Sequence, residues 1–100
     1  MMIVKATDFY GEVFCGQDYS LHVLFDPKGN KIKKHTHDDW DESWYILSGV
    51  YVITIDCVKT EVTTGDLITV RRKVIHSIES LEDSKRIAIF KDGININYEN

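Results

Sequence analysis

What this sequence of 100 residues lacks already excludes several classes of protein. It has no run of about 18 consecutive apolar residues, so we expect no membrane-spanning helix and no membrane partner. Acidic residues outnumber basic ones, 16 to 12, and a formal charge of -4 argues against a nucleic-acid partner, because neutralising phosphates requires a basic face. The N-terminus lacks the basic-then-apolar order of a signal peptide.

Cysteine, proline and helical patterns are also scarce. The two cysteines, Cys15 and Cys57, lie far apart in no CxxC arrangement. We interpret them as reduced thiols of a cytoplasmic protein, with a disulfide as the alternative. No window of a dozen residues places apolar side chains at i, i+3, i+4 and i+7, so helices are not expected. The length predicts one domain over residues 1–100 with a thin core, which favours pairing with a second copy.

Short β-branched and aromatic runs separated by turn residues dominate the sequence instead. The runs expected as strands are Phe9–Cys15, Tyr19–Phe25, Ser43–Ser48, Val50–Asp56, Asp66–Val70, His76–Ser80 and Arg86–Lys91. The turns expected between them include Asp26–Asn30, Thr64–Asp66 and Asp92-Gly93. Strands with turn signals every 8–12 residues predict an all-β sandwich or barrel.

One segment carries a pattern typical of metal ligands. His35 and His37 are two residues apart, so in an extended strand both imidazoles point to one face. After a polar loop, Glu42 begins the next apolar run and can bring a carboxylate to the same point. His76, which opens a later strand, is a candidate fourth ligand. Such a set suits one divalent transition metal, whether Zn, Fe, Mn, Ni, Co or Cu.

These residues resemble the two motifs of the cupin superfamily. Gly29 to Gly49 fits the first motif, G(x)5HxH(x)4E(x)6G, without a mismatch. Gly65 to Ser80 is similar to the second, G(x)5PxG(x)2H(x)3N, with Gly65 and His76 in place. It departs from the motif at three positions, where Pro, Gly and Asn are usual: Arg71, Lys73 and Ser80. The resemblance covers about residues 29–91.

The resemblance implies a fold, a metal site and a class of ligand. The fold would be an antiparallel jelly-roll barrel of six to eight strands, with the metal held inside by His35, His37, Glu42 and His76. The stretches E-x-W-x-x-x-S-G from Glu42 and H-x-I-E from His76 are similar to the cupin module of type II mannose-6-phosphate isomerases. A sugar or sugar phosphate would then be the small-molecule ligand. The metal would polarise it while a protein base moved a proton.

Strand alternation adds candidates for the rest of the pocket. Lys33 is expected to point inward with the histidines, as a weak candidate for the base or a substrate anchor. The alternative is a lysine that reaches solvent. Trp44 shares a face with Glu42 and could stack on a ring or belong to the core, and Ser80 shares a face with His76. Arg71 opens a basic run that is either an anion-binding rim or a solvated turn.

Three functions remain open on the sequence alone. The first is a metal-dependent isomerase-like enzyme acting on a sugar phosphate, and the second is an Fe(II)-dependent dioxygenase. The third is a non-catalytic module that binds a metal or a small ligand, which the short chain favours. A homodimer is expected in each case, because the segment Trp44–Ile55 is apolar and aromatic and belongs to an exposed sheet.

Overall fold

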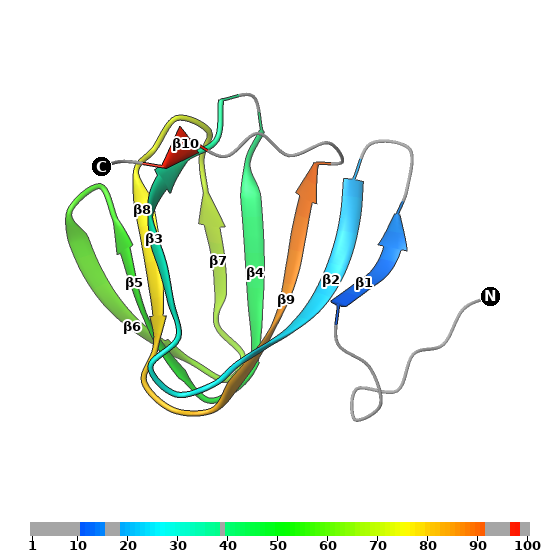
Figure 1. The fold of residues 1–100 in the computed structure, drawn as a ribbon, viewed down its shortest axis with the longest axis vertical. Coiled ribbons are helices and arrows are strands. Elements are labelled where there is room, and N and C mark those ends of the chain that lie inside the picture. The colour runs from blue at the N-terminus through cyan, green and yellow to red at the C-terminus, as the bar shows by residue number, and fades with distance from the viewer. Residues whose placement is uncertain (1–10, 16–18, 39, 92–96, 99–100) are drawn as a thin grey trace.

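A computed structural model describes residues 11–15, 19–38, 40–91 and 97–98, and this part of the chain folds into two antiparallel sheets of five strands each (Figure 1). The first sheet contains, in spatial order, β1 (Gly11–Cys15), β2 (Tyr19–Asp26), β9 (Ser84–Lys91), β4 (Glu42–Ser48) and β7 (Leu67–Val70). The second contains β10 (Asn97–Tyr98), β3 (Lys31–Thr36), β8 (His76–Ser80), β5 (Val50–Ile55) and β6 (Val58–Thr63). Among the described strands, β1–β2 and β5–β6 are hairpins within one sheet, and the other consecutive strands lie in opposite sheets, as in a jelly roll. No described segment is an apolar helix long enough to cross a bilayer.

The all-β prediction is confirmed, but the expected number of strands was too small. Strand β6 was not expected, because its sequence is largely polar and only Val62 is buried. It forms through a two-residue turn at Asp56 and Cys57, which both adopt positive φ (49° and 68°), as type I′ hairpins require. The expected positions Phe9, Tyr10 and the turn at Asp92-Gly93 lie outside the described residues.

The β4–β5 connection depends on a single glycine. Gly49 has a φ of 90°, a region that side chains disfavour. A Cβ at this position would also overlap Ser84, whose hydroxyl accepts a hydrogen bond from the Val50 N–H at 3.0 Å. The glycine therefore lets the β4–β5 connection pack closely against Ser84, the first residue of β9.

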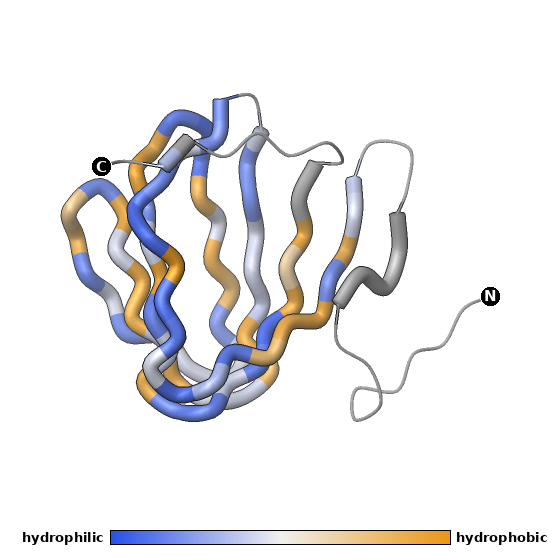
Figure 2. The backbone as a smooth tube through the Cα atoms, in the orientation of Figure 1, coloured by the Kyte–Doolittle hydropathy of each residue, from blue (hydrophilic) through white to orange (hydrophobic). Residues whose placement is uncertain are grey.

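The core lies between the two sheets and follows from strand alternation. Figure 2 shows hydrophobic and hydrophilic residues interspersed along the strands, and in a strand every second side chain faces the same side of the sheet. The first sheet contributes Trp44, Ile46, Val70 and Ala88 to the buried cluster, and the second contributes Tyr51, Ile53, Val62 and Ile78. The two sheets therefore pack face to face, and the inward-facing side chains of both share one interior.

The end of the barrel where the β2–β3, β4–β5 and β8–β9 turns meet is closed by buried polar groups. Asp26 Oδ2 accepts hydrogen bonds from the Tyr51 hydroxyl (2.6 Å) and from Arg86 Nε (2.9 Å). We call Asp26, Tyr51 and Arg86 the closed-end cluster. Ser80 reinforces this end, because its hydroxyl donates to the Pro27 carbonyl at 2.5 Å.

Candidate metal centre

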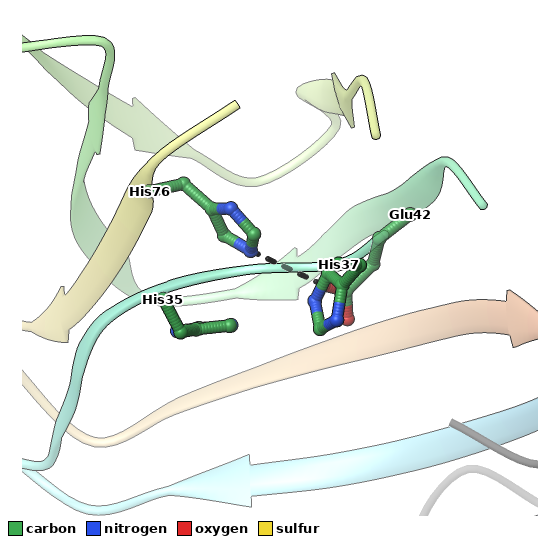
Figure 3. Close-up of side chains that lie close together, drawn as sticks. All are labelled: His35, His37, Glu42 and His76. Atoms are coloured by element: carbon green, nitrogen blue, oxygen red, sulfur yellow. Dashed lines mark ion pairs between the residues drawn. The ribbon is translucent and has the colours of Figure 1, made fainter. Parts of the chain in front are cut away.

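The opposite end of the barrel brings together four side chains from both sheets (Figure 3). His35, near the end of β3, pairs across the second sheet with His76, the first residue of β8. His37 follows β3 directly, and Glu42 is the first residue of β4 in the first sheet. All four are buried, and we call them the ligand cluster. The structure thus assembles the four residues that the sequence motifs single out.

The ligand atoms of these residues are close enough to share one ion. One nitrogen or oxygen from each lies within 4.8 Å of the others. Glu42 Oε1 is 3.3 Å from His37 Nε2 and 3.6 Å from His76 Nε2. Two ligands on opposite sides of a metal with bonds of about 2.1 Å stand about 4.2 Å apart. Movements of a few tenths of an ångström therefore suffice for coordination.

Neighbouring groups aim the ligand atoms at one another. His35 Nδ1 donates to the Lys33 carbonyl at 2.6 Å, and His76 Nδ1 donates to the Val74 carbonyl at 3.0 Å. Because a carbonyl only accepts, each ring carries a hydrogen on Nδ1, and Nε2 is the nitrogen that faces the other ligand atoms. The Trp44 indole N–H donates to Glu42 Oε2 at 2.9 Å, so Oε1 is the oxygen that faces the histidines.

The protonation tendencies of the cluster also suit a cation. Burial lowers the pKa of His35, so the imidazole is biased toward the neutral form that binds metals. Burial acts to raise the pKa of Glu42, but the His76 imidazole 3.6 Å away, the hydrogen bond from Trp44 and the charges of His37 and Arg86 outweigh it and lower the pKa. His76 Nε2 is buried and makes no hydrogen bond. A buried imidazole nitrogen without a hydrogen bond beside an anionic carboxylate fits a divalent metal at this position.

Two tryptophans line the cluster, and the sequence identified only one of them. Trp44 was expected beside Glu42, and it is 2% exposed, so it belongs to the core and is not an open stacking platform. Trp40 is 4% exposed and its ring lies 4.2 Å from that of His37, measured between centroids. In the sequence it stands among acidic loop residues, and an aromatic residue in such a loop is the only signal that could have indicated it.

The acidic and basic segments meet beside the ligand cluster. Asp41 Oδ1 accepts the Arg72 backbone N–H at 2.8 Å and lies 3.9 Å from Arg71 Nε. That backbone hydrogen bond is the main reason why the pKa of Asp41 is lowered. The Arg71 side chain is 80% exposed. Its role as an anion-binding rim stays a prediction.

The turn before His76 forms although Arg71 and Lys73 replace the proline and glycine of the motif. Lys73, at the position where the motif has glycine, adopts a φ of 66°. Its backbone N–H donates to the His37 carbonyl at 2.6 Å, which ties this turn to the loop after β3. A side chain in the left-handed region costs about 1–2 kcal/mol, so the turn is retained at the expense of some stability.

The expected inward orientation of Lys33 is wrong. The register of β3 against β8 shifts between Ile32, which pairs with Ile78, and His35, which pairs with His76. Two residues of β3 therefore oppose the single residue Ser77, which is a β-bulge. The bulge lets Ile32 and His35 both face the interior and leaves the Lys33 side chain exposed. The catalytic hypothesis for Lys33 loses the geometry on which it depended.

Ser80 also lies away from the expected pocket. It is inward-facing and 1% exposed, but it stands at the opposite end of β8 from His76. Its hydroxyl is used by the β2–β3 turn, through the hydrogen bond to Pro27. His22, the remaining histidine, lies 3.3 Å from the Ser20 hydroxyl and is not part of the ligand cluster.

Comparison with known proteins identifies the family. Residues 21–90 match the family described as "Cupin domain". The chain is a cupin. An uncharacterised protein, MJ1618 of Methanocaldococcus jannaschii, is 36% identical over 69 residues, which is 69% of this chain and 55% of that protein. The chain thus matches little more than half the length of this relative.

Solved structures show the same cupin fold at low identity. A protein with a double-stranded β-helix domain from Klebsiella pneumoniae superposes with a TM-score of 0.82 over 99% of both chains, at 15% identity. A proposed sugar phosphate isomerase from Acidithiobacillus ferrooxidans gives a TM-score of 0.73 at 22% identity, over 82% of this chain and 56% of that one. These likenesses establish the architecture of the present cupin.

Proposed function

We propose that this cupin binds one divalent transition metal through the ligand cluster and acts on a small molecule such as a sugar or sugar phosphate. The convergence of four ligand atoms within 4.8 Å, all on buried residues, carries the proposal. The ligand class is supported by the likeness to the proposed sugar phosphate isomerase and by the isomerase-like sequence stretches around Glu42 and His76.

The chain's own residues prepare the site for this chemistry. A bound divalent ion would act as a Lewis acid on a carbonyl or hydroxyl oxygen of the ligand. The Lys33 and Val74 carbonyls fix the orientation of His35 and His76. The Trp44 indole holds Glu42 in place, and Trp40 shields His37 from water. Arg71 would meet a phosphate at the rim.

A non-catalytic metal or small-ligand module is the second candidate. It is favoured by the position of Lys33, because this candidate base faces away from the ligand cluster. Isomerisation needs a group that moves a proton between adjacent carbons. Binding of a metal and ligand needs only the cluster itself.

Metal analysis and an activity panel separate these candidates. Protein purified without a metal-affinity tag should contain about one divalent ion per chain, and His37→Ala should lose it. His22→Ala is the matched control, since His22 lies outside the cluster, and should retain the ion.

An activity panel then tests for catalysis. The isomerase is supported if the wild type interconverts aldose and ketose sugar phosphates and His37→Ala does not. Metal binding without turnover of any sugar phosphate in the panel would favour the non-catalytic module. Bound iron together with oxygen uptake would indicate a dioxygenase. A wild-type chain that binds no divalent metal would overturn the whole proposal.

We further propose that the cupin is a homodimer whose interface is the outer face of the first sheet. Among the described residues, nine large hydrophobic side chains are exposed, and five of them lie on this face: Tyr19, Phe25, Tyr45, Leu67 and Ile89. The register aligns Val23, Ile87, Tyr45 and Leu67 in one row across four strands. An apolar row of this kind suits a two-fold contact with an identical row on a second copy.

The oligomeric state tests the interface. At micromolar concentration, light scattering should give twice the chain mass for the wild type and for Val58→Lys, and the monomer mass for Tyr45→Lys. Val58 is the control, because it is also an exposed hydrophobic residue (65% against 42% for Tyr45) but lies on β6 in the other sheet. A monomeric wild type would contradict the proposal.

We also propose a reducing, cytoplasmic setting, which the exposed free thiol of Cys57 supports.

A further inference from the structure

A second concave site lies on the outer side of the second sheet. It is a hollow of about 730 Å³ formed by β3, β8, β5 and β6. Because His76 and Ile78 point into the barrel, Ser77 and Glu79 of the same strand point outward and line the hollow. The hollow is therefore separated from the ligand cluster by the thickness of the sheet, and it is distinct from the proposed metal site.

The register concentrates positive charge in one row of this hollow. Ser77 pairs with Thr54, and Thr54 pairs with Lys59 on the next strand. On the other side, the bulge of β3 places Lys33 and Lys34 opposite Ser77. Two hydroxyl groups thus lie in the middle of the row, with lysines at both ends.

The neighbouring row offsets only part of this charge. Lys31 and Glu79 form an ion pair at 4.0 Å, and Val52 lies between Glu79 and Glu61 of β6, so this row has one acidic side chain in excess against the three lysines of the first row. Among the described residues that line the hollow, Glu79 is the only acidic one. Four of the nine lysines of an acidic chain line this one hollow, so its local charge is opposite to that of the whole protein. Such a concentration raises the local concentration of anions.

The spacing of the lysines indicates what kind of anion fits. Three inter-strand steps of about 4.8 Å place the backbones of Lys33 and Lys59 about 14 Å apart. Side chains stand roughly perpendicular to a sheet, so in this orientation the ammonium groups at the two ends stay about as far apart as their backbones. A single phosphate then pairs with one end of the row, whereas a chain of two or three phosphates reaches both ends. The volume lies within the range of about 300–1,000 Å³ that is typical of small-molecule sites. We propose that this hollow binds a small molecule carrying two or more phosphate groups, with Lys33, Lys34 and Lys59 pairing its charges and Ser77 and Thr54 donating hydrogen bonds.

The test is an NMR titration of the full chain with tripolyphosphate at low salt. Saturable shifts are expected at the amides of Thr54, Lys59 and Ser77, and orthophosphate should bind at least about tenfold more weakly. Lys33→Glu with Lys59→Glu should raise the Kd for tripolyphosphate at least about tenfold. The control pair, Lys28→Glu with Lys73→Glu, makes the same change in net charge elsewhere on the surface and should raise the Kd less than about threefold.

His37→Ala distinguishes this site from the metal centre, because polyphosphates also bind metals. The variant should keep the same Kd and the same shifts, even though it loses the metal. Equal losses in the two charge-reversal pairs would overturn the proposal, as would shifts confined to the ligand cluster or the absence of saturation. None of these outcomes depends on whether the chain is an isomerase, so failure here leaves the proposed function standing.

Discussion

The barrel contains two buried polar clusters, one at each end, and their hydrogen bonding differs sharply. In the closed-end cluster, Asp26 accepts from Tyr51, from Asn30 and twice from Arg86, so both carboxylate oxygens are used. In the ligand cluster, Glu42 Oε1 faces two histidines at 3.3 and 3.6 Å, and His76 Nε2 makes no hydrogen bond. Both clusters are buried between the same two sheets.

This difference separates a structural role from a binding role. A buried network with every partner in place holds its groups in one arrangement, whereas an incomplete one is destabilising until something completes it. The closed-end cluster is complete without a ligand, whereas the ligand cluster would be completed by a bound cation. Trp44 contacts both, since its N–H holds Glu42 and its ring lies 5.3 Å from the Arg86 guanidinium. One core residue thereby joins the two ends.

Removing the anion of the closed-end cluster is expected to have the largest effect. Asp26→Ala leaves Arg86, 3% exposed, without its carboxylate, and breaking a buried pair in this way costs about 3–5 kcal/mol. Urea denaturation measures the loss. The control is Asp41→Ala, which removes an exposed partner of Arg71 and Arg72 and should cost less than about 1 kcal/mol. Similar losses in the two variants would mean that the closed-end cluster has no special structural role.

We expect a substitution in the ligand cluster to lower the stability of the metal-bound protein and to change that of the metal-free protein little. At a free metal concentration about 100-fold above its Kd, the wild type should gain about 2.7 kcal/mol in unfolding free energy. Glu42→Gln, which keeps the side-chain shape, should lose most of this gain, while its metal-free stability changes by about 1 kcal/mol or less. Denaturation with and without metal measures both quantities. A large loss of unfolding free energy in metal-free Glu42→Gln would mean that the ligand cluster, like the closed-end cluster, has a structural role.

The two clusters also differ in how visible they are in the sequence. The ligand cluster could be predicted, because His35, His37 and Glu42 are close in the chain and stand at spacings typical of cupins. Asp26 and Arg86 are 60 residues apart, and Asp26 was interpreted only as a turn residue. Strand alternation does place Asp26 on the inward side with Ser20, but it cannot identify a partner on another strand.

The orientation of Lys33 shows where alternation fails. A β-bulge inserts one residue and reverses the faces of all residues on one side of it. The bulge opposite Ser77 is a property of the pairing between β3 and β8, and nothing in the local sequence Lys33-Lys34 indicates it. Strand β6 was missed for a related reason, because an exposed polar strand lacks the apolar periodicity by which strands are predicted.

Trp44→Phe tests the link between the two clusters, with a smaller expected effect. Phenylalanine keeps most of the buried ring but removes the N–H that holds Glu42 Oε2. Loss of such a supporting hydrogen bond lowers metal affinity by about 10–100-fold. Competition with a chelator measures the affinity. In Glu42→Gln the same tryptophan substitution should have little further effect, and full additivity of the two changes would contradict the link.

Tyr51→Phe should have the smallest effect, and its pH dependence identifies the closed-end cluster as the cause. Removing the hydroxyl that donates to Asp26 should cost about 1 kcal/mol at neutral pH. Burial raises the pKa of Tyr51, and the hydrogen bond to Asp26 raises it further, so the folded state favours the protonated phenol. A raised pKa gives stability that is fully present below the ordinary pKa of about 10 and is lost as the pH rises above it. Urea denaturation at a series of alkaline pH values should therefore show the wild type losing its advantage over Tyr51→Phe. A constant difference between the two proteins would mean that the Tyr51 hydroxyl does not contribute through this buried carboxylate.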